Sequence, residues 1–278
     1  MIAGLRLNRA AAHALLIGGA LLMAYPLIWM AVSSFRPPFE LGDPSLSVHR
    51  PTLANFSEGW TALGPPFLRF FLNSSLLCAL AVAGNLFSCT LAAFAFARLR
   101  FALRRLWFAL MLGTILLPFH VTIVPQYVLF HQLGWINTLL PLVVPKFLAV
   151  DAFFVFLLVQ FIRTVPRELD EAAEIDGCGS FRLFYLIILP LIVPALATTA
   201  VFTFIWTWND FFAQLLYLNG IDSFTVPVAL RAFLDTTGVQ QPGQLFAMSV
   251  LALVPTFGFF LAFQRLLLEG ISTTGLRG

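Results

Sequence analysis

Six apolar stretches, each long enough to cross a lipid bilayer as a helix, occupy most of this sequence of 278 residues. A spanning helix needs about 20 predominantly apolar residues, and a lone strand in lipid would leave its backbone polar groups unpaired. The sequence therefore predicts an all-α, polytopic membrane protein with six transmembrane helices. The six stretches are residues 12–34, 68–97, 106–131, 138–162, 185–209 and 246–268.

The scarcity of charge supports the same class. Only 10% of the residues are charged, and the mean hydropathy is +0.91. A soluble domain carries about 25% charged residues, so this chain cannot cover itself with a solvated surface. The composition excludes a water-soluble enzyme or binding domain.

The arginines predict the orientation in the membrane, because positive residues gather in cytoplasmic connections. Eleven arginines fall on one side of the six stretches and four on the other, in longer loops. We therefore expect both termini to be cytoplasmic, which an even number of spans allows. The first group is Arg6, Arg9, Arg98, Arg100, Arg104, Arg105, Arg163, Arg167, Arg182, Arg265 and Arg277, and the second is Arg36, Arg50, Arg69 and Arg231.

An acidic segment follows the fourth stretch and predicts a short helix over about residues 166–176. Pro166 suits a first helical turn, where its missing N–H costs nothing. Glu168 and its acidic neighbours would lie at the positive end of the helix dipole, and Gly177 provides a stop. Because this helix is too short and too charged to span, we expect it at the cytoplasmic membrane surface.

One face of this short helix would carry small and apolar residues, with Leu169, Ala172, Ala173 and Asp176 at suitable spacing. Small side chains allow close backbone approach, so the face suits insertion into a groove of a partner. The alternative is a solvated acidic loop that balances the local arginines.

The spacing around this segment resembles a known signature. Glu171-Ala172-Ala173 is followed after three residues by Gly177, after nine more by Ile187, and then by Leu189-Pro190. This pattern is similar to the EAA signature in the permease subunits of binding-protein-dependent ABC importers. The segments "LAAFAFARLRF" (91–101), "LLPFHVTIVPQYVLFHQLGWINTLLPLVVP" (116–145), "FIWTWNDF" (204–211) and "FQRLLLEGISTTGLRG" (263–278) resemble the carbohydrate-importer branch, specifically the smaller six-span subunit of the maltose-importer type.

The resemblance implies a type I ABC importer permease fold in a bacterial or archaeal plasma membrane. It implies an N-terminal part at 1–67, a core permease domain at 68–270 with a coupling helix at 166–177, and a cytoplasmic tail at 271–278. It also implies partners: a second permease in a heterodimer, an ATPase dimer on the cytoplasmic side, and an extracellular sugar-binding protein. The residues expected to couple to the ATPase are Glu168, Glu171, Ala172, Ala173, Asp176, Gly177, Ile187, Leu189 and Pro190.

The energy source must lie outside this chain. There is no G-x-x-x-x-G-K-[ST] loop, and the only lysine, Lys146, is followed by Phe147. We expect a transport subunit rather than an enzyme, with ATP and Mg held by partner subunits and neither cofactor, metal nor nucleic acid bound here.

Two charged residues, Lys146 and Asp151, lie within the fourth stretch. A charge at mid-bilayer costs about 2.5–3.5 kcal/mol on insertion scales, so it should be paired or buried. Five residues apart, they do not stack on a regular helix, but a kink at Pro145 would bring them together. The pair either lines or gates a sugar pathway, or it is a structural pair or a contact with the second permease.

Other candidates for the pathway carry aromatic or polar groups. Trp208, Asn209 and Asp210 combine a ring with amide and carboxylate groups, as sugar sites do, although Trp also marks membrane interfaces. His120 sits two residues after Pro118, where a broken helix would be able to line a pathway. For Asn85 and Ser88, in the second stretch, hydrogen bonds between helices are the favoured role.

Two other functions remain as alternatives. An ion-coupled secondary sugar transporter would need convincing intramembrane carboxylates and usually internal repeats, and only Asp151 is acidic well inside a span. An intramembrane enzyme would need a catalytic pair or a metal motif, and none is evident. The sequence does not name the cargo: a disaccharide, an oligosaccharide and glycerol phosphate are all compatible.

Overall fold

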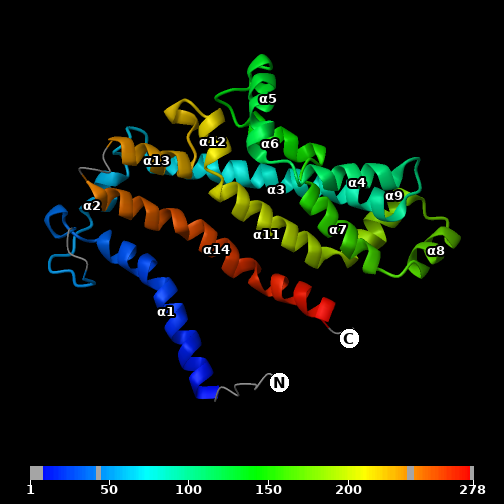
Figure 1. Ribbon diagram of the computed structural model, residues 1–278, viewed down its shortest axis with the longest axis horizontal. Coiled ribbons are helices and arrows are strands. Elements are labelled where there is room, and N and C mark those ends of the chain that lie inside the picture. The colour runs from blue at the N-terminus through cyan, green and yellow to red at the C-terminus, as the bar shows by residue number, and fades with distance from the viewer. Residues whose placement is uncertain (1–8, 42–44, 237–240, 276–278) are drawn as a thin grey trace, which may run out of the picture. The chain divides into compact units, whose positions relative to one another are not determined.

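The computed structural model describes residues 9–41, 45–236 and 241–275. Over these ranges the regular structure is helical throughout, without a strand, which confirms the all-α prediction (Figure 1). The longer helices are α1 (Arg9–Ser33), α3 (Phe67–Arg98), α4 (Arg104–Thr114), α5 (Phe119–Gln132), α7 (Ala152–Thr164), α11 (Val193–Asn209), α13 (Val226–Thr236) and α14 (Pro242–Gly275). The shorter ones are η1 (Pro38–Glu40), α2 (Ala54–Gly59), α6 (Leu140–Val143), η2 (Val144–Leu148), α8 (Glu168–Ile175), α9 (Ser180–Arg182), η3 (Leu183–Ile188), α10 (Leu189–Leu191), α12 (Phe212–Tyr217) and η4 (Ile221–Ser223).

Four helical segments are long and apolar enough to cross a membrane: Ala11–Ser33, Phe67–Arg98, Leu140–Thr164 and Pro242–Gln264. A fifth candidate, formed by Ser180–Leu191 and Val193–Asn209, is bent by 76°. Pro194 lies in the first turn of α11, where its missing N–H cannot continue the preceding helix. Five of the six predicted stretches therefore coincide with candidate spans among the described residues.

The sixth predicted stretch, 106–131, is not one continuous helix. It forms α4, of 11 residues, and α5, of 14 residues, and neither alone has the length of a span. Pro118 precedes α5 in an extended conformation, with ψ 129°, and proline disfavours a helical residue before it. The break that Pro118 suggested is therefore present, and it corrects the expectation of an uninterrupted helix here.

The chain divides into two compact units, Met1–Phe67 with Leu230–Leu253, and Leu68–Ala229 with Val254–Gly278. In the first unit, the Asn55 side-chain amide joins two parts of the chain. Its Nδ2 donates to the backbone oxygens of Ser34 (2.9 Å) and Arg36 (2.7 Å). Gly243 leaves the room for it, because a Cβ there would lie 2.6 Å from Asn55 Oδ1.

The core of the second unit is apolar and involves α3, α7, α8, η3 and the start of α11. The helix α7 also packs against α4 and α11. In Figure 1, α8 lies at the same end of this unit as the end of α3. The core residues are Cys89, Ala93, Phe94 and Ala97 from α3, Phe154, Val155, Leu158, Val159 and Ile162 from α7, and Val165, Ala173, Leu183, Phe184, Ile188, Ile192 and Ala195.

Candidate functional site

The short acidic helix predicted from the sequence is α8, and glycine ends it as expected. Helical residues begin at Glu168, and Gly177 follows the helix with φ +77°. The Gly177 N–H bonds to the Glu174 carbonyl (3.0 Å) and the Cys178 N–H to the Ala173 carbonyl (2.8 Å). This pair of bonds is the Schellman arrangement, in which glycine accepts the left-handed conformation without steric cost.

Two contacts fix α8 to the rest of its unit. The Ala173 side chain is buried in the core of that unit. Arg98, at the end of α3, approaches Asp170 of α8 with 3.0 Å between Nε and Oδ2, and the two side chains are only 3% and 14% exposed. Arg98 Nη2 also donates to the Val165 carbonyl, at 2.8 Å. The helix is therefore held on one side by packing and by a buried charge pair.

Burial raises the pKa of the Asp170 carboxyl above its ordinary value, and the positive charges of Arg98 and Arg167 only partly oppose this effect. Among the described residues, Asp170 Oδ1 and Arg98 Nε have no well-aligned hydrogen-bond partner. Arg98 Nε and Asp170 Oδ2 are thus in ionic contact without good hydrogen-bond geometry. A buried ion pair with an unsatisfied carboxylate oxygen is weak evidence for stability.

The other side of α8 is exposed. Glu168, Glu171 and Ala172 lie on it, and the Ile175 side chain is 87% exposed. An isoleucine this exposed, on a helix with an acidic first turn, leaves a small apolar and acidic surface available. The predicted docking face needs one correction: Ala173 packs inward against the chain's own core, so it anchors α8 and does not share the exposed face.

The last three residues of the spaced signature lie in the helical segments that follow α8. Gly177 ends α8, while Ile187 lies in η3, and Leu189 and Pro190 lie in α10. Ile187 and Leu189 pack against the core, and Pro190 is exposed. They precede the 76° bend and belong to the bent span rather than to the surface of α8.

The intramembrane charges Lys146 and Asp151 meet directly, as the sequence suggested. Lys146 Nζ lies 2.8 Å from Asp151 Oδ2, and the two side chains are 28% and 25% exposed. The intervening backbone is irregular: η2 is a 3₁₀ helix, and Ala149 has φ +54°. This break between α6 and α7 allows residues five positions apart to face each other.

The charge pair belongs to a network that joins three helical segments. Asn85 Nδ2, in α3, donates to Asp151 Oδ2 (2.7 Å) and approaches Thr203 Oγ1 of α11 (3.1 Å). Ser88 Oγ donates to the Lys146 carbonyl at 2.7 Å. The interhelical role favoured for Asn85 and Ser88 is confirmed. Such a network restrains the irregular segment within the apolar region.

The other predicted pathway residues are in different surroundings. Trp208 is 3% exposed and stacks on Phe204, with ring centroids 5.7 Å apart. This tryptophan is thus a packing residue, which corrects its assignment to an open sugar-stacking surface. Asn209 is exposed, and its Nδ2 donates to the Ile205 carbonyl (2.8 Å).

Asp210 is partly buried, and His120 is exposed. Asp210 Oδ1 accepts a hydrogen bond from the Ala213 N–H (3.2 Å). The His120 ring is exposed and lies 5.6 Å from the Phe212 ring. Among these residues Lys146 and Asp151 form a direct ion pair, whereas His120 belongs to an aromatic contact.

Sequence reasoning missed several residues that position these groups. Nothing in the sequence relates Arg98 to Asp170, because they are far apart along the chain. Gly84 brings α3 against η2, since a Cβ there would lie 2.9 Å from Phe147 Cδ2 and 3.0 Å from the Lys146 carbonyl carbon. A glycine within an apolar helix is a usable sign of close approach.

Two known proteins are similar to this chain over almost their whole length. The chain is 34% identical over 272 residues to the trehalose/maltose transport system permease protein MalG of Thermococcus litoralis, covering 95% of this chain and 96% of that protein. It is 32% identical over 267 residues to the arabinooligosaccharides transport system permease protein AraQ of Halalkalibacterium halodurans, covering 93% of each.

A solved structure shares the fold. A chain in the crystal structure of a bacterial ABC transporter involved in the import of the acidic polysaccharide alginate superposes with a TM-score of 0.78, at 20% identity, covering 92% of this chain and 95% of that one. Residues 84–272 match the family described as binding-protein-dependent transport system inner membrane component. The chain therefore belongs to this family, the multi-pass permease subunits of ABC importers.

Proposed function

We propose that this permease forms half of the translocation pathway of a sugar importer, paired with a second, different permease. It works with an ATPase dimer and an extracellular sugar-binding protein. Its six spans place both termini in the cytoplasm, with α4 and α5 together forming the third span and 68–270 the core domain. A sugar cargo is supported by the two relatives named for trehalose/maltose and arabinooligosaccharides.

The coupling role is supported by the different surroundings of the two sides of α8: one side packs against the chain, and the other is exposed. Ala173 and the Arg98–Asp170 contact hold one side, while Ala172 and Ile175 are exposed on the other. A short rigid helix seated in a groove of the ATPase transmits its movement as rigid-body motion of the attached spans. ATP binding then favours one orientation of the pathway because the contacts differ between the two states.

For the pathway, we propose that the Lys146–Asp151 pair acts as a gate or lining element and that Asp210 also contributes to the pathway. The pair is partly exposed and lies at a break in a membrane-spanning segment. Irregular backbone at membrane depth is tolerated where protein buries it or where it lines a cavity. Polar groups at such breaks are where transporters place their substrate and ion sites.

The coupling role is tested by placing a bulky charge on the exposed side of α8. In the chain co-expressed with its partner permease and ATPase, Ala172→Arg should abolish ATPase co-purification and sugar uptake while membrane insertion persists. Ser57→Arg is the matched control, because it adds the same side chain and the same single charge to an exposed position outside α8. Full assembly and uptake in Ala172→Arg and in Glu171→Ala would rule out coupling through α8.

The energy source distinguishes the ATP-driven importer from the alternative, an ion-coupled sugar transporter. The ATP-driven importer makes the following prediction. Uptake through this chain should stop when the ATPase carries an inactive nucleotide site and should continue in the presence of an uncoupler that leaves ATP intact. Uptake that survives loss of ATP hydrolysis and collapses with the uncoupler would support the alternative.

A further inference from the structure

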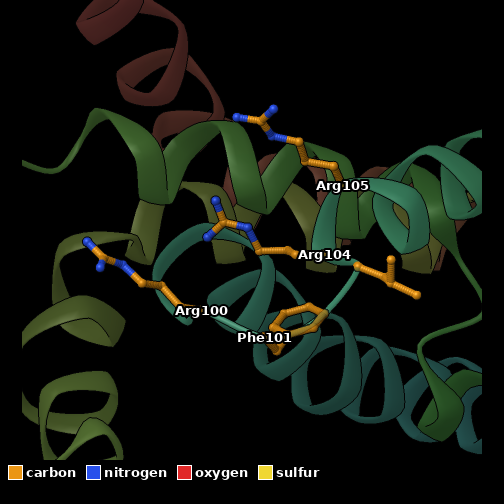
Figure 2. A pocket seen from close by; sticks show the side chains of 5 residues that line it. Arg100, Phe101, Arg104 and Arg105 are labelled. Carbon is orange, nitrogen blue, oxygen red and sulfur yellow. The ribbon is translucent and has the colours of Figure 1, made fainter.

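Four arginines surround two adjoining open cavities where α3 ends and α4 begins. One cavity, of about 340 Å³, is lined by Arg100, Phe101, Leu103, Arg104 and Arg105. The other, of about 260 Å³, shares Arg104 and Arg105 and is also lined by Arg163, Phe96 and Phe108. In the view of Figure 2, the Arg100, Arg104 and Arg105 side chains extend in the same direction. We call this the arginine pocket.

The charges of the arginine pocket are not neutralised within the described part of the chain. The ion pairs of the second unit that the described residues form involve Arg69, Arg98 and Lys146 instead. Arg104 Nη1 donates to the Leu99 carbonyl (2.8 Å), and the Arg163 guanidinium lies 5.5 Å from the Phe108 ring centroid. These contacts orient two guanidinium groups, and among the described residues no carboxylate forms an ion pair with the four arginines.

An exposed apolar surface adjoins the pocket. Leu103 precedes α4 with φ +58°, and Leu106, Trp107 and Leu110 are exposed along α4 itself. None of the α4 residues is buried. In a membrane protein an exposed leucine and tryptophan surface faces lipid, and tryptophan favours the headgroup level. The arginine pocket is therefore next to a surface suited to acyl chains.

We propose that the arginine pocket binds the phosphate headgroup of an anionic phospholipid, with the acyl chains lying along the exposed surface of α4. Guanidinium groups bind phosphate through paired, charge-assisted hydrogen bonds. Basic pockets between helices at the cytoplasmic side are suited to acidic lipid headgroups. A soluble phosphate would use the same donors but would gain nothing from Leu106 and Leu110.

The test measures lipid retained by the assembled transporter after reconstitution in nanodiscs of phosphatidylethanolamine and phosphatidylglycerol. Native mass spectrometry should detect phosphatidylglycerol bound to the wild-type chain. In the double variant Arg100→Gln/Arg105→Gln, the retained phosphatidylglycerol should fall at least about tenfold, because two charge-assisted contacts are lost. Arg104, Arg163 and their neighbours remain, so the positive bias that sets topology is preserved.

Two controls make the outcome decisive. Arg50→Gln/Arg231→Gln removes the same charge from the loops on the other side and should retain phosphatidylglycerol as the wild type does. Arg100→Lys/Arg105→Lys keeps the charge but loses the paired geometry, so its retention should be intermediate. Equal retention in the wild type and the glutamine variant, or an equal loss in the loop control, would overturn the proposal.

A further arm separates lipid from soluble anion. Inorganic phosphate, added in millimolar excess before mass analysis, should leave the retained phosphatidylglycerol unchanged, because it lacks the acyl contacts. Displacement of the lipid by inorganic phosphate would identify the pocket as a soluble-anion site and refute the lipid assignment.

Discussion

Arg98 and Asp170 join the end of α3 to α8 through a buried contact, with 3.0 Å between Nε and Oδ2. Taking two charges out of water is expensive, and their attraction compensates only when further hydrogen bonds satisfy both groups. Here Arg98 gains one such bond, to the Val165 carbonyl, while Asp170 Oδ1 has no partner among the described residues. The pair therefore joins α8 to the end of α3 while one carboxylate oxygen lacks a hydrogen bond.

Removing Arg98 alone should destabilise the chain at neutral pH. Arg98→Met leaves the Asp170 carboxylate buried without its partner, which costs about 3 kcal/mol or more. Thermal unfolding of the purified complex in detergent should show a lowered midpoint, and the loss should shrink as acid protonates Asp170. Arg231→Met, which breaks an exposed pair with Asp235, is the control and should cost at most about 1 kcal/mol.

The raised pKa of Asp170 predicts a pH dependence of stability. Burial favours the protonated carboxyl in the folded chain, so the folded pKa lies above the ordinary value of 3.8. Because the folded chain binds this proton more tightly than the unfolded chain, protonation of Asp170 stabilises the fold. This stabilisation is complete below pH 3.8 and is lost as the pH rises through the folded pKa. The unfolding midpoint of the wild type should therefore decline over this window relative to that of Asp170→Asn, which cannot titrate. A constant difference between the two proteins across the window would contradict the assignment.

Replacing both partners should separate stability from coupling. Arg98→Met/Asp170→Leu removes the buried charges together, and such replacements are often neutral or stabilising by about 1–4 kcal/mol. We nevertheless expect sugar uptake per ATP hydrolysed to fall several-fold, because α8 loses its fixed position relative to α3. Uptake and ATP hydrolysis by the reconstituted complex, measured together, provide the ratio. An unchanged ratio with unchanged stability would show that the pair has no coupling role.

The features that could be predicted from the sequence are those that depend on residues close together along the chain. The apolar stretches, the short acidic helix and its Gly177 stop, and the Lys146–Asp151 pair near Pro145 all follow from local composition and backbone preference. Contacts between distant segments were not predictable in this way. The Arg98–Asp170 pair and the burial of Trp208 against Phe204 depend on how helices pack, and single-sequence patterns carry no distances.

Gly84 should be intolerant of even one added carbon. A Cβ at this position would lie 2.9 Å from Phe147 Cδ2 and 3.0 Å from the Lys146 carbonyl carbon, which is backbone and cannot rotate away. Gly84→Ala should therefore destabilise the chain by about 1–3 kcal/mol, measured as a lower unfolding midpoint. Gly113→Ala in α4 is the matched control, because nothing lies within 4 Å of its Cβ position. The Gly113→Ala substitution should be neutral or should stabilise the chain by about 1 kcal/mol, because alanine has a higher helix propensity than glycine. Equal effects at both positions would contradict the close approach.

The Lys146–Asp151 pair should be more sensitive to the loss of one partner than to the loss of both. Asp151→Leu leaves the ammonium group of Lys146 unpaired near the bilayer interior and removes an acceptor for Asn85. Lys146→Met/Asp151→Leu removes both charges, so it should be more stable than Asp151→Leu alone. A double-mutant cycle should give a coupling energy of about 1–3 kcal/mol, against about 1 kcal/mol or less for the exposed Arg69–Asp222 pair. If the pair also gates transport, the stable double variant will still lose sugar uptake, whereas a purely structural pair will recover uptake together with stability.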